Sequence, residues 1–192
     1  MKKIAVIGGG SWATAIVKIL SNNSSNITWW VRSKETMEFI LKYKHNPNYL
    51  SDVEIDPAKV TATNDLNSSI QNAEIIILAV PSAFLKPTLE ETDASFFKGK
   101  TVFSAIKGIV PDDLLIIGDY LNQKMDIPVE KIGVITGPCH AEEVAMERLS
   151  YLTIASRDSE TAHLLANLMN CRYIKTTVSD DIYGTEIGRA HV

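Results

Sequence analysis

The sequence predicts an α/β protein, in which a doubly wound, mostly parallel sheet carries helices on both faces. Short apolar runs of strand length alternate with amphipathic runs of helix length along all 192 residues. One of these runs, residues 74–80, is apolar on both faces, as expected of a strand inside a parallel sheet. No linker or low-complexity tract interrupts the alternation. We therefore expect one sheet-based domain over residues 1–180.

The elements of the first half follow from local signals. Runs of β-branched and aromatic residues predict strands, and apolar residues spaced by three and four predict helices. Residues 45–57 contain two prolines and no periodicity, so they predict a loop. Strands are expected at residues 4–7, 27–31, 60–63 and 74–80. Helices are expected after residue 10 and at 34–44. A further short helix, capped by Asn64 or Asp65, is expected to end at Gln71.

The second half continues the same pattern. The segment 112–124 has an acidic first turn, which matches the positive end of a helix dipole. Helices are expected at residues 83–93, 112–124, 159–169 and from 141 onward, and strands at 101–106, 132–136, 149–156 and 173–177.

The first strand ends at a glycine-rich turn, Gly8-x-Gly10-x-x-Ala13, which has the spacing of a Rossmann-type dinucleotide-binding turn. Gly8 can adopt the backbone angles of a sharp strand-to-helix turn, and Gly10 has no Cβ to keep a pyrophosphate away from the main chain. Ala13 is small enough for the helix to pack closely on the strand. The N–H groups that begin this helix would then face the phosphates. The alternative is an ordinary glycine turn without a ligand.

Arg32 follows the second expected strand, at the position where this fold meets the adenosine ribose. An acidic residue there favours NAD, whereas an arginine can pair with a 2′-phosphate and stack on adenine. The first acid after the strand is Glu35. We therefore expect NADPH or NADH as the cofactor, with NADP favoured by Arg32. The alternative is a surface arginine at a strand end.

Three further residues follow strand ends, on the sheet edge where ligands bind in such folds. Phe84 could lie against a cofactor ring, although a phenylalanine in this context is more often part of the core. Lys107 could place a fixed positive charge in an active site, or it could be a solvated lysine before a turn. Gly137 ends a strand directly before a helix, and this second junction could also receive an anion.

The composition argues against several classes of function. A formal net charge of −4 gives no general attraction to nucleic acid or anionic membranes. The two cysteines, Cys139 and Cys171, are far apart and the four histidines are scattered, which argues against a disulfide scaffold and a metal site. No apolar run approaches the ~18 residues of a membrane span, and the N-terminus lacks the features of a signal peptide. We expect a cytoplasmic protein.

A set of ordered motifs extends over nearly the whole chain. They are Gly8-Gly-Gly-Ser-Trp-Ala-Thr-Ala15, Trp30-Val-Arg32, Asn48-Tyr-Leu50, Ala79-Val-Pro-Ser82 with Phe84, Ala105-Ile-Lys-Gly108, Gly137-Pro-Cys-His-Ala-Glu-Glu-Val-Ala145 and Asp181-Ile-Tyr-Gly-Thr-Glu-Ile-Gly188. Together they resemble one family, the NAD(P)-dependent glycerol-3-phosphate dehydrogenases of the bacterial biosynthetic type. The resemblance implies reversible hydride transfer between NAD(P)H and dihydroxyacetone phosphate, which gives sn-glycerol 3-phosphate for phospholipid synthesis. It is compatible with a homodimer of the full-length enzyme.

The glycine turn and the resemblance together assign a set of binding residues. Those expected at the cofactor are Gly8, Gly10, Ser11, Trp12, Ala13, Arg32, Tyr49, Phe84, Lys107 and Ala141. The resemblance also assigns Lys107 to the substrate, together with Gly137 and Cys139, and the lysine charge would offset that of the phosphate or of the reacting oxygen. Residue 139 is usually serine or threonine in this family, and a cysteine is a weaker hydrogen-bond donor.

The chain departs from the family pattern at its end. The family continues after Glu-x-Gly with Gly-Ala-Leu-Lys-Asn-Val, and that lysine is its general acid/base. Here the run is Glu186-Ile-Gly-Arg-Ala-His-Val192, so Val192 stands where the lysine should be. The helical substrate domain of the family is missing as well. We therefore expect a truncated chain, or one with a foreign tail, in which residues 181–192 begin the interdomain helix and no catalytic residue is present.

Two functions stay open. In the first, the chain is the cofactor domain of a glycerol-3-phosphate dehydrogenase, which binds NADPH but has little or no turnover alone. In the second, it is a non-catalytic NAD(P)-binding module, such as a redox sensor or a partner subunit.

Overall fold

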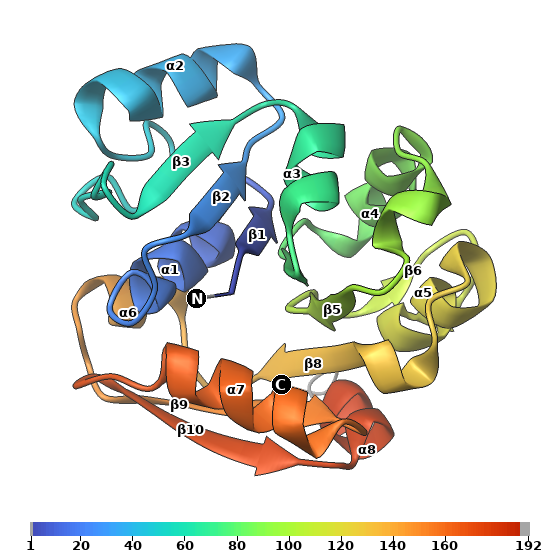
Figure 1. Cartoon of the computed structure of the whole chain (residues 1–192). Helices are drawn as coiled ribbons and strands as arrows, with labels where there is room; N and C mark the ends of the chain where they lie inside the picture. Colours follow the sequence, from blue (N-terminus) through green and yellow to red (C-terminus); the bar gives the residue numbers. More distant parts are fainter. Residues whose placement is uncertain (1, 189–192) are drawn as a thin grey trace.

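Eight strands form the central sheet of the computed structural model, which describes residues 2–188 (Figure 1). Their order across the sheet is β10-β9-β8-β5-β4-β1-β2-β3. The bounds are β1 (Ile4–Ile7), β2 (Ile27–Trp30), β3 (Val60–Thr63), β4 (Ile75–Leu78), β5 (Thr101–Ser104), β8 (Ile132–Thr136), β9 (Ser150–Ser156) and β10 (Ile174–Ser179). A separate two-stranded hairpin consists of β6 (Ile109–Val110) and β7 (Leu115–Ile116).

The sheet is doubly wound and mostly parallel, as the sequence predicts. Every pairing between neighbouring strands is parallel except β8 with β9, which is antiparallel. The chain builds outward from β1 through β2 to β3, and then returns to place β4 on the other side of β1. At such a switch point the connections leave toward opposite faces, so a crevice opens beyond the carboxyl ends of β1 and β4.

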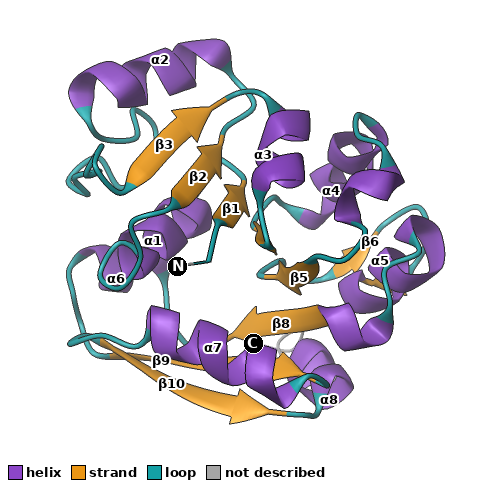
Figure 2. Cartoon of the chain, viewed as in Figure 1, coloured by secondary structure: helices purple, strands orange, loops and turns teal. Residues whose placement is uncertain are grey.

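Helices cover both faces of this sheet (Figure 2). They are α1 (Ser11–Leu20), α2 (Lys34–Tyr43), α3 (Leu66–Asn72), α4 (Ser82–Glu90), α5 (Ile117–Met125), α6 (Ala141–Ala145), α7 (Ser159–Met169) and α8 (Ile182–Gly188), with 3₁₀ turns η1 (Ala94–Phe97) and η2 (Val129–Lys131). One core lies between the sheet and α1, α6 and α7, and the other between the sheet and α3, α4 and α5. Alternate residues of β1 enter the two cores, which is why this strand is apolar throughout. No helix in the described part of the chain could cross a membrane.

The predicted helix 112–124 is wrong at its start. The structure begins α5 at Ile117 and folds the preceding residues into the β6–β7 hairpin. Leu114 has a left-handed backbone (φ 53°), which a continuous α-helix does not allow. Asp113 is held in the hairpin by ion pairs of 3.3 Å to Lys86 and 3.6 Å to Lys124. The acidic residues therefore serve the hairpin rather than a helix N-terminus.

Several predicted strands extend beyond the observed ones. Ladder pairing ends at Trp30, Leu78 and Ser104, although buried apolar residues follow each of them. The chain leaves the sheet there while its side chains stay covered, for example at Val80 and Ile106. These buried continuations form the floor of the edge where ligands are expected.

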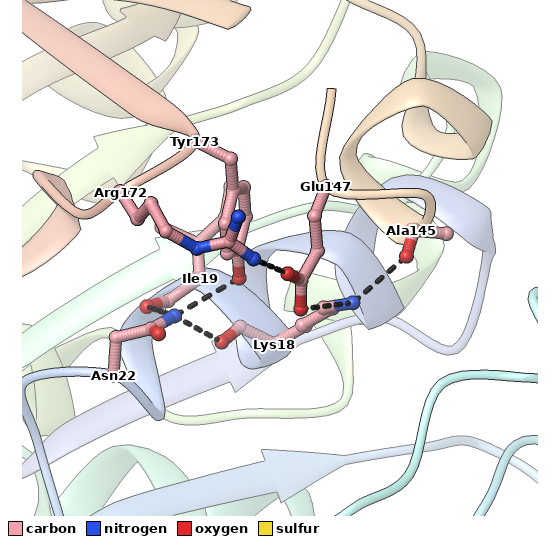
Figure 3. Close-up of polar contacts among 7 residues, drawn as sticks. All are labelled: Lys18, Ile19, Asn22, Ala145, Glu147, Arg172 and Tyr173. Carbon is pink, nitrogen blue, oxygen red and sulfur yellow. Dashed lines mark hydrogen bonds and ion pairs between the residues drawn. The ribbon is translucent and has the colours of Figure 1, made fainter. Parts of the chain in front are cut away.

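A polar network joins α1 to elements from the end of the chain (Figure 3). Lys18 Nζ donates to the carbonyl oxygen of Ala145 at 2.8 Å and lies 3.3 Å from a carboxylate oxygen of Glu147. One turn further along the chain, Asn22 Nδ2 donates to the hydroxyl of Tyr173 at 2.9 Å. The network fixes α1 against the end of α6, so these two helices are held together.

Candidate functional site

The turn after β1 requires glycine at its first position. Gly8 has φ 141°, in a region that side chains strongly disfavour. A Cβ on Gly8 would lie 2.3 Å from the carbonyl oxygen of Ala79, the residue after β4. The backbones of the first and fourth strands therefore approach one another closely where the crevice opens.

Gly10 has a different role, because its surroundings are open. A Cβ built on this residue would meet no atom within 4 Å. Gly10 is the N-cap of α1, and the first intrahelical hydrogen bond runs from Thr14 N–H to its carbonyl oxygen at 3.0 Å. The N–H groups of the next three residues have no carbonyl one turn before them in the helix. Open space and unsatisfied donors together make a cradle suited to an anion.

A first cavity, of about 250 Å³, extends from the glycine turn to the end of β2. Arg32, Tyr49 and Phe84 line it, and each of the two aromatic side chains is 48% exposed. The guanidinium carbon of Arg32 lies 5.5 Å from the centroid of the Phe84 ring. The interpretation of Phe84 as a core residue is therefore wrong. Its ring forms, with Arg32, an exposed surface on which a planar group can stack.

The start of α2 adds a negative charge beside this cavity. Ser33 caps the helix by accepting a hydrogen bond from Thr36 N–H at 3.2 Å, and its hydroxyl donates to Glu35. This hydrogen bond from Ser33 lowers the pKa of the Glu35 carboxyl. Arg32 and Ser33 line the cavity, and the exposed carboxylate of Glu35 is hydrogen-bonded to Ser33.

A second cavity, of about 320 Å³, lies on the other side of the turn, between the first turns of α1 and α6. Ser11 and Trp12 line it from α1, and Ala141 from α6. A third cavity, of about 390 Å³, follows and is lined by Gly137 and by Gly188 of α8. The first two cavities share Gly10, Val80 and Pro81, and the last two share Lys107, Cys139 and His140. Together they form one continuous channel, which we call the groove.

Lys107 lies where the second and third cavities meet. It follows β5, and its side chain is exposed. Gly108, with φ 88°, turns the chain sharply after it. The two interpretations of Lys107 from the sequence are therefore compatible. Its side chain is solvated before a turn, and it also places a positive charge in the groove.

The third cavity has a second turn that requires glycine. Gly137 has φ 159°, and a Cβ there would lie 2.2 Å from the carbonyl oxygen of Tyr151 in β9. Cys139 is buried at 8% exposure, but it borders both the second and the third cavity. The short helix α6 then begins after His140, whose N–H donates to the side chain of Glu143 at 3.2 Å.

The groove brings together almost every site residue that the sequence suggests. Ala13 is the exception, because it is fully buried behind the turn, where its small side chain allows α1 to pack on the sheet. Position 192, where the family lysine is expected, lies outside the described residues. The predicted site residues that line the groove are Gly8, Gly10, Ser11, Trp12, Arg32, Tyr49, Phe84, Lys107, Gly137, Cys139 and Ala141.

Sequence reasoning missed Asn46, which lies in the loop before Tyr49. It is fully buried, and its amide reaches the glycine turn from a segment more than thirty positions along the chain. A polar residue in a loop without periodicity carries no signal of burial. The neighbouring Pro47 marks a turn, but it does not indicate what the asparagine binds.

Comparison with known protein families matches residues 3–162 to the family described as NAD-dependent glycerol-3-phosphate dehydrogenase N-terminus. The chain belongs to this family. The resemblance found in the sequence is thereby confirmed.

Individual relatives agree with this assignment. An NAD(P)+ glycerol-3-phosphate dehydrogenase from Oceanobacillus iheyensis is 34% identical over 190 residues, which are 99% of this chain and 55% of the relative. One from Alcanivorax borkumensis is 35% identical over 97% of this chain and 53% of its own length. The solved structure of Plasmodium falciparum glycerol-3-phosphate dehydrogenase superposes with a TM-score of 0.86 at 27% identity, over 97% of this chain and 54% of that one. The chain spans about half the length of the curated relatives it matches.

Proposed function

We propose that the groove binds NADPH or NADH, and that this chain is the cofactor-binding part of a glycerol-3-phosphate dehydrogenase. The observation that carries the proposal is the continuity of the groove. A cavity with stacking groups, a cradle for a diphosphate and a cavity beside a lysine follow one another along the sheet edge, in the order of the parts of a dinucleotide. The open space at Gly10 and the free donors of α1 fit a diphosphate in particular.

Each part of the groove then has a partner in the cofactor. Arg32 and Phe84 hold the adenosine end, and Arg32 can pair with a 2′-phosphate. The main chain from Gly10 to Trp12 holds the diphosphate. The nicotinamide enters the second cavity, where the first turns of α1 and α6 shield it from water. When bound, this group supplies a hydride to a carbonyl carbon.

The third cavity is the proposed site of dihydroxyacetone phosphate or sn-glycerol 3-phosphate. Lys107 reaches it from the nicotinamide side, and the positive charge stabilises either the phosphate or the oxygen that gains charge during reduction. Gly137 lines the cavity at the bend after β8, where its lack of a side chain lets the chain pass close to the carbonyl oxygen of Tyr151. Cys139 borders the cavity with a thiol, which is a weaker donor than a hydroxyl. When hydride adds to the carbonyl carbon, the carbonyl oxygen becomes an alkoxide that must receive a proton, and we assign no residue among 2–188 to that step.

The same reasoning assigns the parts of the chain. We propose that residues 1–180 are the cofactor domain and that residues 181–192 begin the helix that leads to a substrate domain. The 192-residue chain is then expected to bind cofactor and to reduce dihydroxyacetone phosphate at or near background. A homodimer of the full-length enzyme is part of the same expectation.

Two measurements test the proposal. Titration of the chain with NADPH and NADH, followed by nucleotide fluorescence, is expected to show saturable binding of at least one of them, and binding of neither would contradict it. Rapid reduction of dihydroxyacetone phosphate by the 192 residues alone would contradict the expected lack of turnover.

The alternative of a non-catalytic NAD(P)-binding module makes the same prediction for binding. The two functions differ in the gene, since an in-frame continuation past codon 192 that contains Lys-Asn-Val would exclude a sensor or partner subunit. A natural gene that ends without this lysine would favour it.

A further inference from the structure

Three consecutive carbonyl groups of the glycine turn accept hydrogen bonds from side chains. Trp29 Nε1 donates to the oxygen of Gly8 at 2.7 Å, Asn46 Nδ2 to that of Gly9 at 3.0 Å, and Thr14 Oγ1 to that of Gly10 at 2.9 Å. The donors come from a strand, a loop and a helix. All three carbonyl groups are therefore held by side chains of the protein.

The three donors are fully buried, so they hold the carbonyl groups toward the interior. In a planar trans peptide the C=O and the following N–H point in opposite directions. Fixing the Gly9 carbonyl inward therefore turns the N–H of Gly10 outward. The Gly10 carbonyl, which accepts from both the N–H and the hydroxyl of Thr14, does the same for Ser11. Both residues line the groove. The interior hydrogen bonds thus determine where the anion-binding donors point.

Asn46 is the centre of this arrangement. Besides its bond to Gly9, its amide donates to Thr14 Oγ1 at 2.9 Å, and its oxygen accepts from the N–H groups of Asn48 at 3.0 Å and Tyr49 at 3.3 Å. Two donors and two acceptor positions are the full capacity of an asparagine side chain. The same residue therefore fixes the glycine turn, the first turn of α1 and the loop that carries Tyr49 into the groove.

We propose that Asn46 and Thr14 are positioning residues for the cofactor diphosphate, with Trp29 anchoring the start of the turn. They do not touch the ligand. They hold two glycine peptides so that the N–H groups of Gly10 and Ser11 are already aimed at a diphosphate before it binds. This preorganisation avoids the cost of turning flexible glycine peptides when the ligand arrives. The inference rests on the proposed function, because it concerns the same dinucleotide site.

Thr14 offers a matched pair of variants. Thr14→Val removes the hydroxyl while keeping the branched shape, and Thr14→Ser keeps the hydroxyl. Asn46→Leu removes all four hydrogen bonds of the amide at similar volume. As a control, Asn122→Leu makes the same change in a part-buried asparagine whose Nδ2 donates to the carbonyl oxygen of Ile127 at 2.9 Å, away from the groove.

The dissociation constants of ADP-ribose, which contains the diphosphate, and of adenosine, which lacks it, are measured for each variant by ¹H–¹⁵N NMR titration. Thr14→Val and Asn46→Leu are expected to weaken ADP-ribose about tenfold, as for loss of one or two well-aimed donors to a charged group, while adenosine changes less than about twofold. Thr14→Ser and Asn122→Leu are expected to bind both ligands like the wild type. In the wild type, the amide signals of Gly10 and Ser11 are expected to shift strongly with ADP-ribose.

Other outcomes overturn the inference in distinguishable ways. Equal weakening of both ligands would mean that the two residues merely support the fold, and unchanged ADP-ribose binding would mean that the peptides need no fixing. If Asn46→Leu does not fold, the comparison of Thr14→Val with Thr14→Ser decides, since Thr14→Val keeps the branched shape without the hydroxyl and Thr14→Ser keeps the hydroxyl without the branch. A wild-type chain that binds neither ADP-ribose nor NAD(P)H would contradict the proposed function itself.

Discussion

The side chain of Glu186 caps the first turn of another helix, accepting a hydrogen bond from the N–H of Ile117 at 2.9 Å. The same oxygen accepts from Gly118 N–H at 3.3 Å, and the carboxylate is only 7% exposed. A Cβ on Gly118 would lie 3.1 Å from the other carboxylate oxygen, so glycine permits the approach. A negative group at a helix N-terminus is favourable, because the free N–H groups and the helix dipole are positive there. The contact docks α8 on α5 and thereby places Gly188 at the third cavity.

Replacing Glu186 by glutamine is expected to destabilise the chain by about 1–2 kcal/mol, since an oxygen acceptor remains but its charge is lost. The free energy of unfolding in urea, followed by circular dichroism, measures the effect. Glu91→Gln, at an exposed carboxylate after α4, is the control and should stay within about 0.5 kcal/mol of the wild type. Equal stability of the two variants would show that the negative charge of Glu186 contributes nothing to the cap.

Arg32 and Glu35 are expected to act in opposite directions on the choice between NADPH and NADH. Arg32→Gln should weaken NADPH about tenfold or more and NADH by clearly less, because both cofactors lose stacking on the guanidinium but only NADPH carries the 2′-phosphate. Glu35→Gln should strengthen NADPH, because its ionised carboxylate repels that phosphate. Fluorescence titrations at low and at high salt measure the effects of both variants. The changes in NADPH affinity that each variant causes should shrink as salt screens the charges. Equal affinities of the wild type for the two cofactors would contradict a preference for NADPH.

Phe84 should matter for binding and little for folding. Phe84→Ala removes a half-exposed ring from the groove, so we expect a several-fold loss of NAD(P)H affinity and a change in unfolding free energy below about 0.5 kcal/mol. Phe84→Tyr keeps the ring and should restore binding. Tyr43 is 50% exposed at the end of α2, and Tyr43→Ala should leave the affinity for both NADPH and NADH unchanged. A large loss of stability in Phe84→Ala would instead show that the ring contributes to folding as a core residue does.

Tyr173 should make stability depend on pH in the alkaline range. Burial raises the pKa of Tyr173 to about 12, from an ordinary value of 10.0. The unfolded chain releases the phenolic proton first, so the contribution of this residue is complete below pH 10 and is lost as the pH rises toward 12. Urea unfolding of the wild type and of Tyr173→Phe at pH 8, 9.5 and 10.5 measures it. The wild type should lose more stability over this range than the variant, and parallel pH curves would disprove the assignment.

The sequence predicted the sheet because its central strands, β1, β4, β5 and β8, are buried on both faces, and a mostly apolar run is a strong local signal. The β6–β7 hairpin was missed for the opposite reason. Two-residue strands have no periodicity, and the acids at 112 and 113 match a helix start equally well. The deciding feature, the left-handed backbone of Leu114, belongs to a residue type that rarely adopts it.

The candidate site was predictable where chemistry follows strand ends. Gly8, Lys107 and Gly137 each follow a predicted strand, and a parallel sheet brings the ends of its strands to one edge. Their positions relative to the strands were therefore enough to place them together. Phe84 was uncertain, because its spacing does not tell which side of α4 faces an opening. Asn46 could not be found, since its partners Gly9 and Thr14 lie in other elements and become its neighbours only after folding. The binding roles of all these residues stay predictions.

The hydrogen bond between Lys18 and Ala145 has a consequence for the order in which the protein is made. The two residues are 127 positions apart, so a ribosome adding roughly 5–20 residues per second needs on the order of ten seconds to deliver the second after the first. During that interval α6 has not been made, so Val144 cannot yet cover the apolar flank of α1 as it does in the folded protein. The oldest part of the nascent chain is therefore among the last to be completed, and it is the part for which a chaperone has the longest opportunity to act.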